Sequence, residues 1–464
     1  MSFADALGIG VRGVVLRRGD PGYDDARRVW NARVDRAPVA VFRPADADDV
    51  AHAVGVAQEC GLDLAIRSSG HNAAGYGTAE AGLVIDLGGW NEIAVDPDRA
   101  LARVGPGATW GEVDRATQAH GLATTGGRIS TTAVGGLALG GGHGWLMRSC
   151  GLTVDNLRSV DLVLADGRKV TASADENPDL FWGLRGGGGN FGAVICFELA
   201  LHEVGPFVTG GALFYAVERA RDVLRAYREL MSVAPDELAA LFNILVAPAA
   251  PFIPRGLQGR TVAAIAVCHA GSPEQARRDL AALDAVGPPL LDRTGRMPYG
   301  VQQSLFDAAG SFGNSVYGRS GYLIDLDDDI VDIVVENAAR ITSPLSIVMI
   351  SPLGGAVARV PSGATAYSHR QHAFSLSIDA VWADRSDSSR HMRWVDLFWS
   401  AIGSRTHGVY VNELGDEGPD RIRDAYAPAT YRRLAALKAD WDPTNTFRLN
   451  QNVVPDHLSA LPVR

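Results

Sequence analysis

The feature that most constrains this chain is the segment Arg67-Ser-Ser-Gly-His71-Asn-Ala-Ala-Gly-Tyr-Gly77, which places one histidine inside a glycine-rich loop. The loop follows a short, mostly apolar run over 62–66 that is expected to be a strand. Its glycines allow positive φ and can turn backbone N–H groups toward an anion. A histidine in such a loop can offer a ring nitrogen as a nucleophile to a bound cofactor. The alternative is a plain turn with a solvated histidine.

Size and charge limit the classes of protein. With 464 residues, about two domains of ordinary size are expected. The formal net charge of −10 argues against nucleic acid as a main partner. No run of 18 or more apolar residues occurs, and residues 1–7 lack the basic-then-apolar order of a secretory signal. We therefore expect a soluble, cytoplasmic protein without a membrane partner, and a homodimer is the assembly that we consider.

The four cysteines give no sign of a metal site. Cys60, Cys150, Cys196 and Cys268 are widely spaced and form no CxxC pair. Because Cys60 and Cys196 stand in apolar sequence surroundings, both are expected to be inert core thiols.

The order of elements suggests several regions. Strands are expected at 38–42, 83–87 and 100–104, and helices at 47–60, capped by Asp46 or Asp48, and at 109–120. Residues 158–204 are interpreted as strands with a tight turn at Asp166-Gly167. After about 205 the glycine clusters stop and strands alternate with helices. The expected regions are a lead-in (1–35), a first domain (36–205), a second domain (206–410) and a C-terminal segment (411–464).

Four glycine-dense stretches, at 67–77, 105–107, 126–144 and 186–192, can each bring backbone N–H groups close to a ligand. Gly187–Gly192 satisfies GxGxxG, but the following residues 193–201 have strand character, so the strand-loop-helix context of a Rossmann site is missing. Four loops around one extended polyanionic ligand indicate FAD. The alternative is that the glycines only mark tight turns.

Several motifs together carry a family resemblance. They are Arg67-Ser-Ser-Gly-His71-Asn, Val104-Gly-Pro-Gly107, Gly135-Gly-Leu-Ala-Leu-Gly-Gly-Gly-His-Gly144, Gly151-Leu-Thr-Val-Asp-Asn156, Leu180-Phe-Trp-Gly-Leu-Arg-Gly-Gly-Gly-Gly-Asn-Phe-Gly192 and the C-terminal Asp442-Pro-Thr-Asn-Thr-Phe447-Arg-Leu-Asn450-Gln-Asn452. In these motifs the chain resembles the FAD-linked oxidases of the vanillyl-alcohol-oxidase superfamily, and within it the berberine-bridge-enzyme group. The resemblance covers about 35–205 and 360–457.

The resemblance implies an α+β protein. It consists of a PCMH-type FAD-binding domain of two α+β subdomains, a substrate domain with an antiparallel sheet backed by helices, and a last segment that returns to the FAD domain. The implied activity is an FAD-dependent oxidase that takes a hydride from a C–OH or C–N bond of a small or medium organic substrate (a sugar, alkaloid or secondary metabolite) and passes electrons to O2. Two alternatives are a flavin-fold binding protein without turnover and a dehydrogenase with another electron acceptor.

The family pattern also implies how the flavin is attached. His71 corresponds to the histidine that bonds to the flavin 8α carbon. Ile129 stands where many members carry a cysteine that attaches the flavin a second time, and Cys150 is at the wrong position for that role. A single covalent attachment is therefore expected.

The remaining cofactor-binding residues implied by the resemblance come from the glycine-rich motifs and the C-terminal segment. They are Arg67, Ser68, Ser69, Gly70, Asn72, Gly75, Tyr76, Gly127, Ile129, Ser130, Thr131, Gly135, Gly136, Gly140, Gly141, Gly142, His143, Gly144, Asp155, Asn156, Gly192, Val194, Asn450 and Asn452. His143 is open to two interpretations: a second attachment point or base, or a loop histidine beside the flavin or its ribose.

Candidates for the base depart from the family pattern. Members often carry it in a Tyr-x-Asn-Tyr motif, which here reads Tyr410-Val-Asn412-Glu413. Glu413 thus occupies the usual tyrosine position, and a carboxylate in a partly desolvated pocket can act as base with a raised pKa. Asp379 is the second candidate, since alternation along the strand expected at 374–382 places it on a polar face. Tyr317 and Tyr322 are candidate pocket-lining residues.

Overall fold

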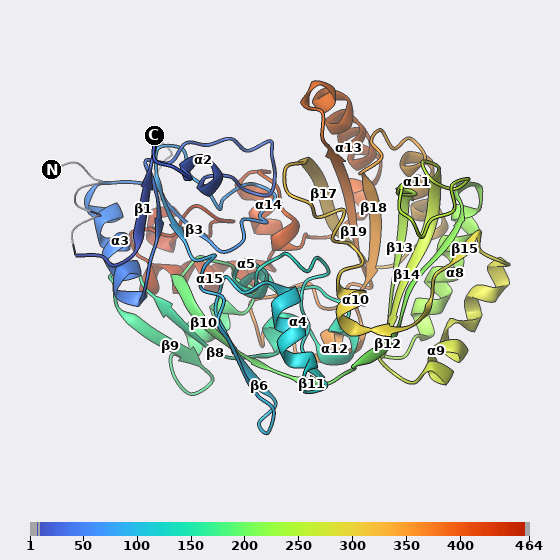
Figure 1. Cartoon of the computed structure of the whole chain (residues 1–464), viewed down its shortest axis with the longest axis horizontal. Coiled ribbons are helices and arrows are strands. Elements are labelled where there is room, and N and C mark those ends of the chain that lie inside the picture. Colours follow the sequence, from blue (N-terminus) through green and yellow to red (C-terminus); the bar gives the residue numbers. More distant parts are fainter. Residues whose placement is uncertain (1–6, 8–9, 460–464) are drawn as a thin grey trace.

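The computed structural model describes residue 7 and residues 10–459. Figure 1 shows two parts side by side: the N-terminal region together with the C-terminal segment at one end, and a large sheet backed by helices at the other. Most of the N-terminal stretch considered above as a targeting signal, residues 1–6, lies outside the described residues.

The first sheet places the His71 loop at the end of a strand. Its order is β1-β2-β4-β3, with parallel pairing of β4 to both β2 and β3. Its elements, with the helix that links β2 and β3, are β1 (Val14–Arg17), β2 (Ala40–Arg43), α3 (Ala47–Glu59), β3 (Leu64–Arg67) and β4 (Leu83–Asp86). The Asp46 side chain caps α3 by accepting from the Asp49 N–H. The loop thus leaves β3 directly at Arg67.

The second sheet is antiparallel, in the order β5-β6-β10-β8-β9. These strands are β5 (Ile93–Asp96), β6 (Leu101–Val104), β8 (Leu157–Val163), β9 (Lys169–Ser173) and β10 (Ala193–Ala200), and a small ribbon pairs β7 (Leu122–Ala123) with β11 (His202–Glu203). Because β10 is a strand, Gly187–Gly192 does not open a helix, and the rejection of a Rossmann site is confirmed.

The glycine-dense regions are connected by short helices around the second sheet. They are α4 (Trp110–Gln118), α5 (Val134–Gly140), α6 (Met147–Cys150), the 3-10 helix η1 (Thr153–Asp155) and α7 (Pro178–Leu184). A capping box between Thr109 and Glu112 starts α4. The sequence pattern does not predict α7, because five of its seven residues are buried and the helix shows no amphipathic period.

The third sheet forms the core of the second part and is antiparallel throughout. Its order is β15-β12-β14-β13-β18-β19-β17, with β16 also paired to β12. The strands are β12 (Phe207–Ala216), β13 (Leu238–Val246), β14 (Thr261–His269), β15 (Leu291–Asp292), β16 (Gly295–Pro298), β17 (Ser315–Leu323), β18 (Ile347–Pro352) and β19 (Phe374–Trp382).

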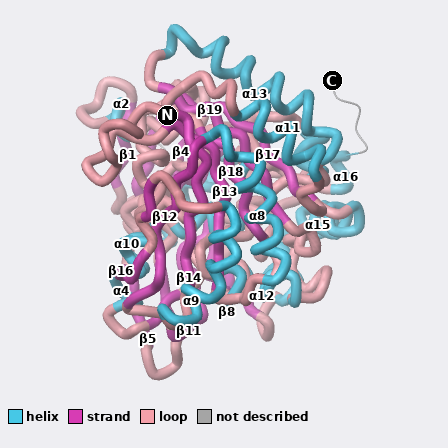
Figure 2. The backbone as a smooth tube through the Cα atoms, turned by 90° about the vertical axis from the view of Figure 1, so that its right-hand side faces the viewer, coloured by secondary structure: helices cyan, strands magenta, loops and turns pink. Residues whose placement is uncertain are grey.

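Helices cover one face of this sheet (Figure 2). They are α8 (Ala220–Val233), α9 (Pro273–Leu280), α11 (Asp328–Ala338) and α13 (Ser388–Ile402), and most of them pack on the side chains that point to that face, such as Leu376 and Ile378. The opposite face looks toward the first part, where Trp145 and Leu146 pack against side chains of β12, β13 and β14. Short connections are α2 (Tyr23–Ala26), α10 (Tyr299–Gln303), α12 (Gly355–Arg359), η2 (Val217–Arg219), η3 (Ala281–Val286), η4 (Arg385–Asp387) and η5 (Gly403–Arg405).

The C-terminal segment packs back on the first part. It contains η6 (Val411–Glu413), α14 (Pro419–Asp424), α15 (Pro428–Trp441) and α16 (Asp456–Ser459), and α15 contacts α7. Lys438 of α15 is fully buried, pairs with Asp442 at 2.8 Å, and donates to the backbone carbonyls of Asn190 and Phe447. Burial lowers the pKa of Lys438 to about 8. These contacts tie the segment to the glycine-rich loop before β10.

Replacing Lys438 by Met is expected to destabilise the protein by about 3–5 kcal/mol, because it leaves the buried Asp442 carboxylate without its cation. Chemical denaturation measures the change. The matched control is Lys169→Met, which removes an exposed pair with Asp48 and is expected to leave the stability almost unchanged. Equal losses in the two variants would contradict a stabilising role for the buried pair.

Two expectations from the sequence differ from the structure. The region predicted as a lead-in supplies β1 to the first sheet, where it pairs with β2 in antiparallel register. Cys60, predicted to be a core thiol, is exposed, because it follows the last turn of α3, where the chain turns at Gly61.

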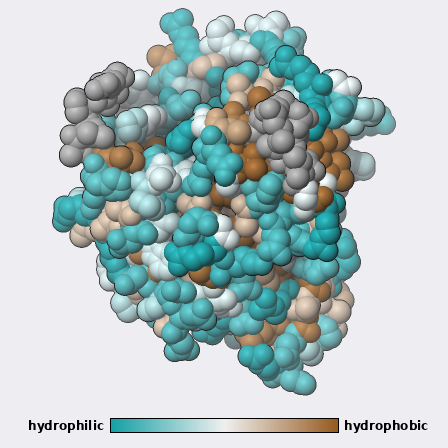
Figure 3. Space-filling model, turned by 90° about the vertical axis from the view of Figure 1, so that its left-hand side faces the viewer, coloured by the Kyte–Doolittle hydropathy of each residue, from teal (hydrophilic) through white to brown (hydrophobic). Residues whose placement is uncertain are grey.

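In the described part of the chain, no helix has the length and apolar character needed to cross a membrane. The face drawn in Figure 3 is mostly hydrophilic, with smaller apolar areas between polar ones.

Candidate active site

The two longest glycine-rich segments lie against each other. Ser69 Oγ accepts a hydrogen bond from the Ala133 N–H at 2.9 Å. The His71 Nε2 and Thr131 Oγ1 atoms are 3.2 Å apart, which joins the histidine to the same block. The His71 loop and the 126–144 block therefore form one surface.

His71 is enclosed by aromatic side chains. Its ring stacks on Trp30 with 5.5 Å between centroids and meets the edge of Phe312 at 5.0 Å. Burial lowers the pKa of His71 to about 4, and the Asp307 carboxylate opposes this shift. The imidazole is therefore neutral at physiological pH, which is the form that can act as a nucleophile.

A loop of the second part, residues 304–314, closes over this surface. Asp307 accepts from the Ser130 N–H at 2.7 Å and from Ser130 Oγ at 2.6 Å. Trp30 Nε1 donates to the Gly310 carbonyl at 2.8 Å, and the Ile129 side chain lies where a Cβ on Gly310 would stand. Ile129 and Ser130 are thus positioned by contacts with this loop.

The glycines of the 126–144 block are required by close packing. A Cβ at Gly140 would lie 2.0 Å from Asn412 Oδ1, one at Gly142 2.0 Å from Thr153 Oγ1, and one at Gly135 2.3 Å from Ser68 Oγ. Gly141 and Gly142 also have positive φ. At Gly136, by contrast, a Cβ would meet no atom within 4 Å. At Gly136 the backbone of the block therefore faces open space.

The rest of the predicted flavin-binding loop is held by its own turns. Asn72 accepts from the Gly75 N–H and, through Oδ1, from the Tyr76 N–H. Gly70 and Gly75 have positive φ, and Gly75 packs on Val34. A Cβ at Gly127 would clash with the Leu137 side chain, and one at Gly144 with the Gly126 carbonyl.

Two C-terminal amides approach the same region. Asn450 Nδ2 donates to the Gly189 carbonyl at 2.9 Å. Asn450 Oδ1 and Asn452 Oδ1 are buried and have no hydrogen-bond partner among the described residues. Backbone donors, open space beside Gly136 and unpaired amides are the groups that an extended ligand with a pyrophosphate and a polar ring can use, so these residues fit FAD.

Some residues predicted to bind the cofactor use their side chains elsewhere. Arg67 pairs with Asp86 at 2.8 Å. Asp155 forms a two-pronged pair with Arg370, and Asn156 donates to the carbonyls of Cys150 and Leu152. Because these side chains are engaged within the protein, we expect Arg67, Asp155 and Asn156 to contact the cofactor only through backbone atoms.

Gly192 and Val194 lie at the β8–β10 pairing. A Cβ at Gly192 would lie 2.7 Å from the Val163 carbonyl, and Val194 pairs with Leu162 and is buried. Their contribution to cofactor binding stays a prediction.

His143 belongs to a buried cluster of tyrosines. Its Nε2 lies 2.8 Å from Tyr367 Oη, which lies 2.7 Å from Tyr322 Oη, and its ring stacks on Tyr410 with 3.9 Å between centroids. Burial and the Arg128 charge hold the pKa of His143 well below its usual range. Its Nδ1 has no hydrogen-bond partner among the described residues. Sequence reasoning missed Tyr367, which stands in a loop without a motif.

The segment 410–413 docks on α5. Tyr410 Oη accepts from the Gly142 N–H at 2.7 Å and from Asn412 Nδ2 at 2.8 Å, and Asn412 Nδ2 also reaches the Leu137 carbonyl. These contacts fix the orientation of η6, and Glu413 follows at its end.

The two candidate bases lie on the same side of the third sheet, because η6 packs on β17 and Gly318 of β17 pairs with Asp379 of β19. Burial, and then the charge of Asp379, raise the pKa of Glu413 to about 7, while Arg128 and the neighbouring Ser320 oppose the shift. Burial raises the pKa of Asp379 to about 6. Glu413 Oε2 has no hydrogen-bond partner in the described part of the chain. The Asp379 charge thus helps to raise the pKa of Glu413, which keeps one acceptor oxygen without a partner.

The inner face of the third sheet carries the polar side chains opposite this pair. The strand expected at 374–382 is confirmed as β19, and Leu376 and Ile378 pack on the helices, so Ser375, Ser377 and Asp379 alternate to the other face. Tyr322 is on the inner face, but Tyr317 is not: it packs on the helix side, and its hydroxyl donates to Asp396 of α13. Tyr317 is therefore not a pocket residue.

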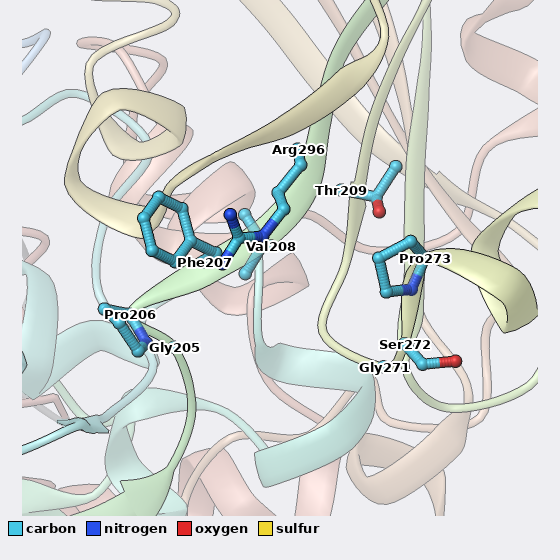
Figure 4. A pocket seen from close by; sticks show the side chains of 9 residues that line it. All are labelled: Gly205, Pro206, Phe207, Val208, Thr209, Gly271, Ser272, Pro273 and Arg296. Carbon is cyan, nitrogen blue, oxygen red and sulfur yellow. The ribbon is translucent and has the colours of Figure 1, made fainter.

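A separate surface pocket lies away from this site. Figure 4 shows it at the start of β12, with a volume of about 260 Å³. Phe207 and Arg296 lie at one side of it, with the guanidinium 3.7 Å from the ring centroid, and Ser272 and Pro273 at the other. It has no carboxylate, histidine or cysteine in its lining, so it has no group for proton transfer.

Comparison with known proteins agrees with this geometry. Family models for an FAD binding domain and for "Berberine and berberine like" match residues 38–173 and 409–454. The chain is 30% identical to (R)-6-hydroxynicotine oxidase of Paenarthrobacter nicotinovorans, over 98% of this chain and all of that protein. It is also 30% identical to xylooligosaccharide oxidase of Thermothelomyces thermophilus, over 92% of this chain and 89% of that one. The crystal structure of 6-hydroxy-D-nicotine oxidase from Arthrobacter nicotinovorans superposes with a TM-score of 0.85 and 28% identity, covering 96% of this chain and 99% of the other.

Fold and site together define an FAD-linked oxidoreductase. The chain belongs to the berberine-bridge-enzyme-like family of FAD-linked oxidases. The predicted α+β fold, the FAD cofactor and the enzymatic class are thereby confirmed.

Proposed function

We propose that this enzyme is an oxidase whose FAD is bound covalently by His71 alone, and in which Glu413 accepts the proton that leaves the substrate while its C–OH or C–N bond is oxidised. The observation that carries the proposal is the buried Oε2 atom of Glu413, which has no hydrogen-bond partner among the described residues, in a carboxyl group whose pKa burial and the Asp379 charge raise. Bound FAD supplies the two-electron acceptor for the hydride.

The backbone of the glycine block and the amides of Asn450 and Asn452 would hold the cofactor. His71 would form the covalent bond, since its imidazole is neutral and enclosed between Trp30 and Phe312. Bound FAD would supply the electrophilic carbon for this bond, and His71 would supply the ring nitrogen.

Glu413 is suited to accept a proton near neutral pH. Its raised pKa makes the carboxylate a stronger base than an exposed glutamate. The docking of Asn412 and Tyr410 on α5 keeps the acceptor in one place relative to the glycine block. A substrate hydroxyl or amine can therefore lose its proton to a preoriented group.

The direct test is an absorbance spectrum of the purified protein before and after acid precipitation. A yellow pellet supports covalent attachment, whereas flavin found entirely in the supernatant excludes it. Hydrogen peroxide formed in step with substrate oxidation identifies O2 as acceptor. Flavin reduction by substrate without peroxide on aeration would instead assign a dehydrogenase.

A single attachment point is expected, because Ile129 provides no thiol at the position of the family's second link. Peptide mapping by mass spectrometry should find flavin only on a peptide that contains His71. Burial raises the pKa of the Cys150 thiol to about 11, so little thiolate is available for attachment there. A flavin-modified peptide containing Cys150 would overturn this prediction.

A further inference from the structure

Arg128 carries a charge in the site without an opposite partner in the described part of the chain. Its Nη1 donates to Ser351 Oγ at 3.1 Å and lies 3.8 Å from Met349 Sδ. Its Nε and Nη2 are buried and have no hydrogen-bond partner among the described residues. Glu413 acts on it electrostatically, but the two groups do not come within the 4.0 Å of an ion pair.

Other buried arginines of the chain are paired. Arg67 holds Asp86, and Arg370 forms a two-pronged pair with Asp155. Arg148 donates to backbone carbonyls through all three of its nitrogens. A buried guanidinium remains charged and is costly unless its donors are satisfied. Arg128, by contrast, has two buried nitrogens without a partner and no carboxylate in an ion pair among the described residues.

The free donors of Arg128 lie on one edge of the guanidinium. Nε and Nη2 are the two nitrogens that can donate in parallel to both oxygens of a carboxylate. Ser351 occupies the remaining nitrogen and holds the side chain toward the inner face of β18. Arg128 contacts Met349, which pairs with Ser377 of β19, and Ser377 pairs with Ser320 of β17. Because η6, which ends at Glu413, packs on β17, Arg128 and the candidate base face the same part of the inner sheet.

We propose that Arg128 binds a carboxylate of the substrate, so that the enzyme oxidises a hydroxy acid or an amino acid and not a neutral sugar or an alkaloid base. The proposal rests on the proposed function, because it takes the Glu413 site as the place of reaction. The carboxylate on Arg128 would orient the substrate so that its hydroxyl or amine faces Glu413. Arg128 is then the residue that determines the substrate class.

The charged groups around Arg128 also predict how carboxylate binding depends on pH. A bound carboxylate adds a negative group beside the acid pair, so binding should be strongest when that pair is protonated. Affinity for a carboxylate should therefore fall as the pH rises through about 6 to 7. The titratable groups that face Arg128 are Glu413, Tyr410, His143 and, through the sheet, Tyr227.

The test is binding of benzoate and of its uncharged counterpart benzamide to the flavin-loaded protein, followed by the perturbation of the flavin absorbance spectrum. Wild type is expected to bind benzoate about 10- to 100-fold more tightly than benzamide, the range for a hydrogen bond to a charged group. Arg128→Met should abolish this preference, and Arg128→Lys should restore part of it, because lysine keeps the charge but not the two-pronged edge.

Arg319→Met is the matched control. Arg319 is on β17, 3.6 Å from Glu417 and over the Tyr317 ring on the helix side, so its loss should leave the benzoate preference unchanged. Equal affinity for benzoate and benzamide in wild type, or an unchanged preference in Arg128→Met, overturns the proposal. The flavin retained after acid precipitation, and the loss of flavin reduction in Glu413→Gln, report separately on the proposed function, so the two can fail independently.

Discussion

Flavin reduction in the Glu413→Gln variant is expected to be about 10²- to 10⁴-fold slower than in wild type, the usual cost of losing a positioned base. Glutamine keeps the shape of the side chain and removes its basicity, so FAD should stay attached. The measurement is anaerobic flavin bleaching with any compound, from a panel of sugars, amines and hydroxy acids, that reduces the wild-type flavin.

The control for this variant is Asp416→Asn, which changes an exposed carboxylate three residues further along and should have no effect. The comparison with Asp379→Asn decides between the two candidates. If only Asp379→Asn slows reduction, the base belongs to β19. If neither variant does, proton removal needs no carboxylate, and the mechanism fails while the flavoprotein assignment stands.

The same pair predicts the pH dependence of the reductive step. The reactive form of Glu413 is the carboxylate, which exists above its pKa of about 7, so the rate should fall as the pH is lowered through that value. Asp379→Asn removes the neighbouring negative charge, and the midpoint should then move to lower pH. Because the two groups titrate together, the measured midpoint describes the pair.

The local elements of the FAD-binding part could be read from the sequence. Apolar runs and capping signals predicted β2, α3, β4 and α4 to within a few residues, and Asp46, one of the two caps considered, caps α3. The helix α7 was not predicted, since a short and mostly buried helix has no polar face that would reveal a helical period. The prediction for Cys60 was wrong for a similar reason. The residue types around a position do not show whether its side chain faces the core or the solvent at the end of a helix.

The site was only partly predictable. His71 and Glu413 stand in recognisable motifs, and alternation along β19 identified Asp379 from the strand alone. That Asp379 and Glu413 would interact could not be read from the sequence, because it depends on how two segments from different parts of the chain pack. Arg128 and Tyr367 escaped notice because only the burial of their polar atoms among distant partners distinguishes them.

The His71→Ala variant is expected to lose all covalently bound flavin, so that acid precipitation releases the yellow colour completely into the supernatant. FAD should still bind, because the glycine block and the amides of Asn450 and Asn452 do not depend on the imidazole. Substrate oxidation should also slow, since the imidazole substituent withdraws electrons from the flavin and makes it a stronger oxidant. His143→Ala is the matched control, because His143 is the other histidine of the glycine-rich segments and is held in the tyrosine cluster. Flavin retained by the His71→Ala pellet and lost from the His143→Ala pellet would move the attachment to His143 and overturn the assignment.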